Sequence, residues 1–101
     1  MAQFDIYRNT NPVTCAEIPY VVDIQVELLH HLSTCVVIPL SSKAKALKHL
    51  NPIFVIEEQN VVLMTQEMAG IERVLLGEKL ISLSEYRSEI FAAIDFLISG
   101  F

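Results

Sequence analysis

Alternation of apolar and polar residues is the first pattern along the chain. In residues 3–7, Phe4 and Ile6 would lie on one face of a strand, with the side chains between them on the other. Residues 20–26 alternate in the same way and place Asp23 toward solvent. The inward positions of this second strand are Val22, Ile24 and Val26. Both segments therefore predict half-buried strands, joined by a loop rich in turn-forming residues.

The middle of the chain mixes strand and helix signals. Residues 34–40 are rich in β-branched side chains and hold Pro39, so we expect a strand near a sheet edge. Residues 41–52 combine serines, good helix formers and an Asn-Pro stop, which predicts one short helix. Leu28 and Leu29 are adjacent at a bend, and one of them should face solvent.

Further short strands complete the predicted sheet. Residues 53–65 indicate two strands joined by a tight turn at residues 58–60. Residues 71–83 add another strand, in which Gly77 would relieve a turn. Short strands at this spacing predict a mainly β (α+β) fold, with a small antiparallel sheet that can curl into a barrel.

The clearest predicted element is a helix at the end of the chain. Ser82 and Glu85 have capping-box spacing, and Gly100 would end the helix. One apolar stripe makes Leu97 a core residue, whereas Phe96 falls on the far side. The stripe is formed by Leu83, Tyr86, Ile90, Ala93, Ile94, Leu97 and Phe101. The tip of this helix therefore carries apolar surface that one stripe does not explain.

Composition turns that surplus into an expected interface. The 101 residues favour a single domain, residues 1–101, yet 52% are hydrophobic and only 19% charged. Such a surplus indicates a homodimer or a partner surface. The longest segment free of charged residues, 28–42, is too short to span a membrane. No basic segment leads into an apolar stretch at the N-terminus, so we expect a cytoplasmic protein without a membrane contact.

Charge and motifs argue against nucleic-acid binding and catalysis. The net charge is −5, and the one lysine cluster, at residues 43–48, has the spacing of a solvated helix face. Cys15 and Cys35 form no metal-binding pair. A dyad of Cys35 with His31 would lack an orienting third group, and no phosphate loop, nucleophile elbow or zinc motif is present. We therefore expect no enzyme activity, no metal and no cofactor.

Six segments in order resemble the CcdB family of plasmid-addiction toxins. They are QFDIY, YVVDIQVELL, VVIPL, LNPIF, LMTQEM and LSEYRSEIFAAIDFLISGF, and they cover nearly the whole chain. The resemblance implies an SH3-like antiparallel barrel of the CcdB/Kid/MazF type with a long C-terminal helix. It also implies a homodimer that poisons DNA gyrase without enzymatic activity of its own.

The resemblance further implies two protein partners. The dimer would insert into the dimerisation region of the gyrase A subunit and trap the enzyme with cleaved DNA. A cognate CcdA-type antitoxin would remove it, with contacts in the loop of residues 8–15 and in the groove of the dimer. DNA would be bound only indirectly, through the antitoxin complex. The gyrase-binding positions implied here are Leu28, Leu29, Asp95, Ile98, Ser99, Gly100 and Phe101.

Four of these positions differ from the best-known family members. Those members carry Trp in place of Ser99, Asn in place of Asp95, Phe in place of Ile98 and Ile in place of Phe101. Two alternatives therefore stay open: an endoribonuclease toxin on the same fold, or an inactive decoy that binds antitoxin.

Overall fold

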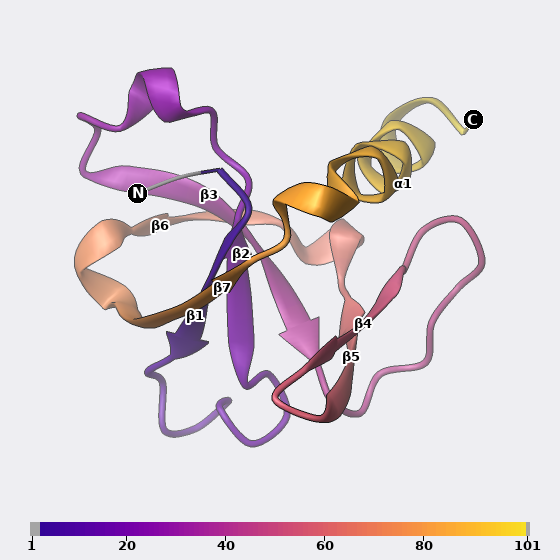
Figure 1. The fold of residues 1–101 in the computed structure, drawn as a ribbon, viewed down its shortest axis with the longest axis horizontal. Helices are drawn as coiled ribbons and strands as arrows, with labels where there is room; N and C mark the ends of the chain where they lie inside the picture. Colours follow the sequence, from indigo (N-terminus) through magenta and orange to yellow (C-terminus); the bar gives the residue numbers. More distant parts are fainter. Residues whose placement is uncertain (1–2, 101) are drawn as a thin grey trace.

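The computed structural model describes residues 3–100 and shows one curled antiparallel sheet with a C-terminal helix (Figure 1). Its strands are β1 (Asp5–Asn9), β2 (Tyr20–Asp23), β3 (Thr34–Ser41), β4 (Ile53–Ile56), β5 (Gln59–Leu63), β6 (Ala69–Glu72) and β7 (Leu76–Ser82). The α-helix is α1 (Arg87–Ser99), and four 3₁₀ turns are η1 (Glu27–Leu29), η2 (Thr65–Glu67), η3 (Arg73–Leu75) and η4 (Ser84–Tyr86). The expected mainly β fold with a long C-terminal helix is confirmed.

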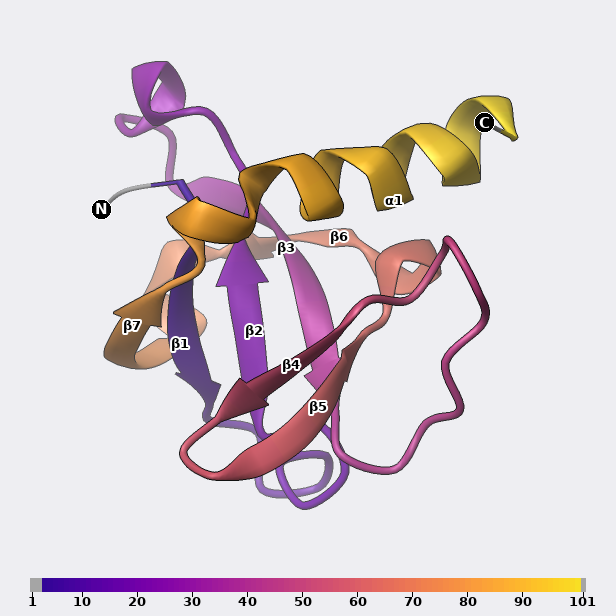
Figure 2. The same cartoon turned by 45° about the vertical axis from the view of Figure 1, so that its right-hand side comes forward.

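The sheet forms an incompletely closed barrel. Its strand order is β4-β5-β3-β2-β1-β7, and β6 pairs with β3 beside β5. Helix α1 lies across one face of the sheet (Figure 2). The core under that helix contains Phe4, Ile6, Tyr20, Val22, Ile38, Leu40, Phe54, Ile56, Val61, Leu63, Leu83 and Ile90. The inward positions predicted at Phe4, Ile6 and Val22 are therefore confirmed.

The opposite face of β1 and β2 is buried as well, contrary to the half-buried strands expected. Asp5, Tyr7 and Asp23 are all almost inaccessible to solvent. The curl of the sheet brings η3 over this face, where a guanidinium nitrogen of Arg73 lies 3.6 Å from Asp23 Oδ2. Val26, predicted to point inward, is exposed because β2 ends at Asp23.

Strand β3 is central, so its prediction as a near-edge strand is wrong. It pairs with β2 on one side and, on the other, first with β6 and then with β5. Pro39 lies between the β6 partners, which end at Val37, and the β5 partners, which begin at Leu40. The missing N–H of proline is therefore not needed at that position, which removes the usual objection to proline in a central strand.

The helix predicted over residues 41–52 is absent, because Ser41 ends β3 and residues 42–52 form a loop. The hydroxyl of Ser41 accepts hydrogen bonds from the backbone N–H groups of Lys43 and Ala44, as a cap would. The buried side chain of Asn51 then accepts from Leu47 N and donates to Leu63 O. These contacts satisfy the backbone in a non-helical form, which outweighs local helix propensity.

Hairpin β4–β5 and Gly77 refine two further predictions. The hairpin is present, but its turn is Glu57–Glu58, because Ile56 pairs directly with Gln59. Gly77 lies inside β7 rather than in a turn. A Cβ atom there would stand 2.7 Å from the carbonyl oxygen of Arg8, so glycine permits a close approach of β1 and β7.

Candidate functional site

Helix α1 is anchored to the sheet along its first half. Ile90 and Ala93 are fully buried, and the rings of Phe91 and Phe4 form a T-shaped contact at a centroid distance of 5.5 Å. The guanidinium of Arg87 stacks over Phe91 at 4.8 Å. These contacts fix the direction in which the rest of the helix projects.

The second half of α1 departs from the predicted stripe. Leu97 is exposed, whereas Phe96 is half-buried, with its ring 5.7 Å from that of His49. The loop of residues 42–52 rises toward the second half of the helix (Figure 2), and its His49 contacts Phe96. Leu97 as core and Phe96 as spare surface are therefore corrected.

The end of the helix is presented to solvent. Ile98 is 77% exposed, and Asp95, Ser99 and Gly100 are exposed too. Ser99 donates its hydroxyl hydrogen to Asp95 O at 2.7 Å, and Gly100 ends the helix with φ of 79°. Phe101 lies outside the described residues. The predicted helix end at Gly100 is confirmed.

The leucine pair lies in η1, within a loop held by side-chain hydrogen bonds. Leu28 is 78% exposed and Leu29 is 38% exposed, so both leucines face solvent, where at least one was expected to. Gln25 accepts a hydrogen bond from Val36 N and donates to Thr34 O, which ties the loop to β3. The η1 loop and the end of α1 lie at opposite ends of the molecule (Figures 1 and 2). One copy of the chain therefore does not join the two sets of residues into one surface.

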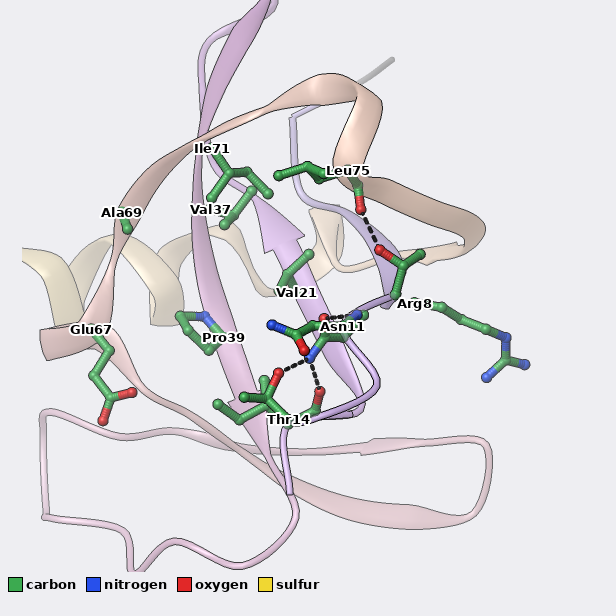
Figure 3. Close-up of a pocket in the computed structure, with 13 residues that line it drawn as sticks. Arg8, Asn11, Thr14, Val21, Val37, Pro39, Glu67, Ala69, Ile71 and Leu75 are labelled. Atoms are coloured by element: carbon green, nitrogen blue, oxygen red, sulfur yellow. Dashed lines mark hydrogen bonds between the residues drawn. The ribbon is translucent and has the colours of Figure 1, made fainter. Parts of the chain in front are cut away.

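A groove of about 470 Å³ opens on the face of the sheet away from α1 (Figure 3). Its floor is apolar, and its rim includes the loop after β1. The side-chain amide of Asn9 shapes that loop by donating hydrogen bonds to Thr14 Oγ1 and to Ile18 O. The hydroxyl of Thr10 donates a hydrogen bond to Leu75 O. The apolar wall is formed by Ile18, Val21, Val37, Pro39, Ala69, Ile71 and Leu75.

Sequence reasoning missed this wall. The signal was available, because residues 20–22 and 35–40 are nearly continuous apolar runs, which are typical of strands covered on both faces. The loop expected to contact an antitoxin, residues 8–15, does border the groove through Arg8, Asn11 and Thr14.

The arginine at the groove rim is held by two carboxylates. Arg8 donates two hydrogen bonds to the Glu57 carboxylate and one to Glu78, and its side chain points away from the cavity (Figure 3). Tyr20 donates to Glu57 at 2.6 Å. The hydrogen bond from Tyr20, together with those from Arg8, lowers the pKa of Glu57. Arg8 is therefore a structural tie between β1, β7 and the β4–β5 turn.

Buried polar groups cluster behind the groove. Burial raises the pKa of Asp23, of Tyr7 and of the Cys35 thiol. Lys79 Nζ lies 3.4 Å from Asp5 Oδ2. The Tyr7 hydroxyl has no hydrogen-bond partner among the described residues. Within residues 3–100, no group of three His, Cys, Asp or Glu side chains could hold a metal ion.

Comparisons with known proteins relate the chain to toxins. The family model described as CcdB protein matches residues 3–100. A Mycobacterium tuberculosis toxin, MazF-mt6, superposes with a TM-score of 0.76 at 16% identity, over 93% of this chain and 95% of that one. An endoribonuclease in complex with its cognate antitoxin, from a mycobacterial species, superposes with a TM-score of 0.78 at 12% identity. The superposition covers 97% of this chain and 94% of that one. A search of curated proteins found no match. At these identities the structures establish the fold, which is of the CcdB/MazF type.

Proposed function

Because the chain belongs to the CcdB family, a family of toxins from toxin–antitoxin systems, we propose that it is a toxin that poisons DNA gyrase. In this proposal a homodimer binds the dimerisation region of the gyrase A subunit in the cytoplasm and traps the complex with cleaved DNA. The protein would act by contact, with no catalytic step of its own. A cognate antitoxin would neutralise it.

The exposed end of α1 carries this proposal. Ile90 and Ala93 hold the base of the helix in the core, while Ile98 offers an apolar side chain to solvent. Gly100 has open space around the position a Cβ would take, so a partner backbone can approach closely. A rigid helix with an apolar, glycine-terminated end is suited to insertion into a pocket of another protein rather than to binding a substrate for catalysis. The gyrase contacts proposed are Asp95, Ile98, Ser99, Gly100 and Phe101.

The leucine pair in η1 is the second proposed contact. Since η1 and the end of α1 lie at opposite ends of one copy, the proposed homodimer would bring the leucine pair of one copy and the helix end of the other to the same target. The groove beside residues 8–15 is the proposed antitoxin site, because its apolar wall suits an extended partner segment.

A gyrase cleavage assay tests the proposal. The full chain should accumulate cleaved DNA, and deletion of residues 99–101 should abolish the effect while the circular dichroism spectrum stays unchanged. Ile98→Lys should weaken it at least about tenfold, as expected for an interface anchor. Val74→Lys, at a valine in η3 that is 85% exposed, is the matched control and should have no effect. A folded truncated protein that still trapped cleaved DNA would refute the role of the helix end.

Endoribonuclease activity is the second candidate, because both solved structures compared above are toxins of the MazF type or endoribonucleases. The acidic balance and the engagement of Arg8 by two carboxylates disfavour it. Incubation of the purified protein with RNA separates the two candidates, since catalytic cleavage of the RNA would favour the nuclease.

The remaining alternative is an inactive decoy that binds antitoxin. Absence of growth arrest when the chain is expressed alone, together with tight antitoxin binding, would favour the decoy.

A further inference from the structure

The two end strands of the sheet, β4 and β7, line one groove of about 300 Å³. Ile53, Phe54 and Val55 border it from β4, and Ile81 and Ser82 border it from β7. The first turns of the helical segment close it with Leu83, Glu85, Tyr86 and Glu89. The opening in the barrel is therefore a groove with a strand edge on each side, separate from the end of α1.

The edge of β4 is ready for pairing. Leu63 N donates to Pro52 O, so the hydrogen-bonded pairs of the hairpin involve Phe54 and Ile56. Ile53 and Val55 alternate with them, which directs their N–H and C=O groups away from β5. Among the described residues β4 pairs with β5 alone, so that side has no strand partner. Two donors and two acceptors are thus aligned along an open edge.

The side chains at this edge are also unprotected. Ile53 is 57% exposed and Val55 is 65% exposed, and Ile81 is exposed beside them in the groove. Soluble proteins usually blunt an edge strand with lysine, proline or a bulge. Strand β4 is short, but its sequence IFVI holds no lysine or proline, and its register with β5 shows no bulge. An open backbone edge and an apolar groove therefore coincide.

The negative charge of the groove favours a basic binding partner. Glu85 and Glu89 line it, and none of its lining residues is basic. Arg87, between them in sequence, is held over Phe91 instead. A second copy docked by the same edge would set these acidic groups against their own copies. A basic extended segment would be attracted to them.

We propose that the β4 edge binds an extended segment of another protein in which aliphatic residues alternate with lysine or arginine. The segment adds as a strand beside β4, with its aliphatic side chains on Val55 and Ile81 and its basic groups near Glu85 and Glu89. This site does not depend on the gyrase proposal, because it shares no residue with the end of α1.

Nuclear magnetic resonance of the full-length ¹⁵N-labelled protein tests this site. The probe is a capped peptide of about eight residues in which valine and lysine alternate, a usual strand length. Binding should shift the amide signals of Ile53 and Val55 and slow their hydrogen exchange. The same peptide with alternate amides N-methylated should bind at least about tenfold more weakly, since it cannot pair along one edge.

Variants test the edge and the charge separately. Val55→Lys should weaken binding at least about tenfold, whereas Val74→Lys, at an exposed valine outside the groove, should not. The double variant Glu85→Gln with Glu89→Gln should reduce both affinity and its salt dependence. Equal binding of the methylated peptide, shifts confined to other strands, or no binding at about 1 mM would overturn the proposal. So would a dimer in which a second copy protects the Ile53 and Val55 amides.

Discussion

The imidazole ring of His49 lies 5.7 Å from the ring of Phe96, at an interplanar angle of 48°. This contact ties the loop of residues 42–52 to the last turns of α1. His49 adopts a left-handed backbone with φ of 70°, which directs its ring to the helix. The helix end is thus supported from the side by a loop that is distant in sequence.

A double-mutant cycle should detect this contact. His49→Asn removes the ring but tolerates positive φ, and Phe96→Ala removes the other partner. We expect the two effects on the free energy of unfolding to couple by about 0.5–1.5 kcal/mol, as for aromatic pairs. Urea unfolding of the two single variants and the double variant measures this. Additivity within about 0.3 kcal/mol would show that the rings do not stabilise each other.

Gly77→Ala should destabilise the fold, whereas Gly70→Ala should not. The added methyl at position 77 meets Arg8 O at 2.7 Å and Thr10 Cγ2 at 2.9 Å, so β1 or β7 must shift. We expect the free energy of unfolding to fall by about 1–3 kcal/mol. At position 70 nothing lies within 4 Å, and the change should stay within about 0.5 kcal/mol. Thermal unfolding compares the pair, and equal melting temperatures would contradict the close approach.

Glu58→Gly should stabilise the protein. Glu57 and Glu58 have φ of 51° and 65°, and this two-residue turn places both in a region that glycine adopts without a Cβ penalty. Glycine also raises the conformational entropy of the unfolded chain, and after this cost the free energy of unfolding should increase by about 1 kcal/mol. Chemical denaturation provides the measurement. Glu57→Gly should gain less, because it also removes the contacts with Arg8 and Tyr20.

Stability should depend on pH through Glu57. Its folded pKa lies below the ordinary value, because Tyr20 and Arg8 donate hydrogen bonds to the carboxylate. The stabilisation is therefore complete above the ordinary pKa and is lost as pH falls through the folded pKa. The difference in urea midpoint between the native protein and Glu57→Gln should be largest near about pH 7 and shrink toward about pH 3. A difference that stays constant over this range would contradict the assigned cause.

Ser99→Trp should strengthen gyrase binding if the helix end is the contact. Tryptophan is the residue of the best-known family members at this position, and a tryptophan anchor contributes about 2 kcal/mol, or about thirtyfold in affinity. Calorimetry with the gyrase A dimerisation region measures the gain. Ser88→Trp, at an exposed position on α1 away from its end, is the matched control. A similar gain from both variants would indicate nonspecific apolar contact.

Local signals were sufficient for several elements. Phe4, Ile6 and Val22 alternate as a strand requires, and Gly100 can end a helix because it lacks a Cβ. The exposed leucine at position 28 also followed from two adjacent apolar residues at a bend. In each case the physical cause lies within one turn or one strand, so the amino-acid order alone contains it.

Long-range contacts overrode local preference elsewhere. Residues 41–52 have a helical composition, yet Asn51 donates a hydrogen bond to Leu63 O in β5, and residues 42–52 form a loop. Asp23 is buried because the sheet curls and brings Arg73 to it, which no pattern within β2 can show.

The order of residues thus predicted the mainly β fold class, the first strands, the final helix and the family, since these depend on side-chain alternation and on segments of matching sequence. It did not predict that residues 71–83 divide into the end of β6, the turn η3 and strand β7. Three-dimensional packing established which face of each element is free. Phe96 is covered and Leu97 exposed because a distant loop reaches one side of α1. The open β4 edge likewise exists because the sheet curls without closing, and closure depends on the whole sheet rather than on any one strand.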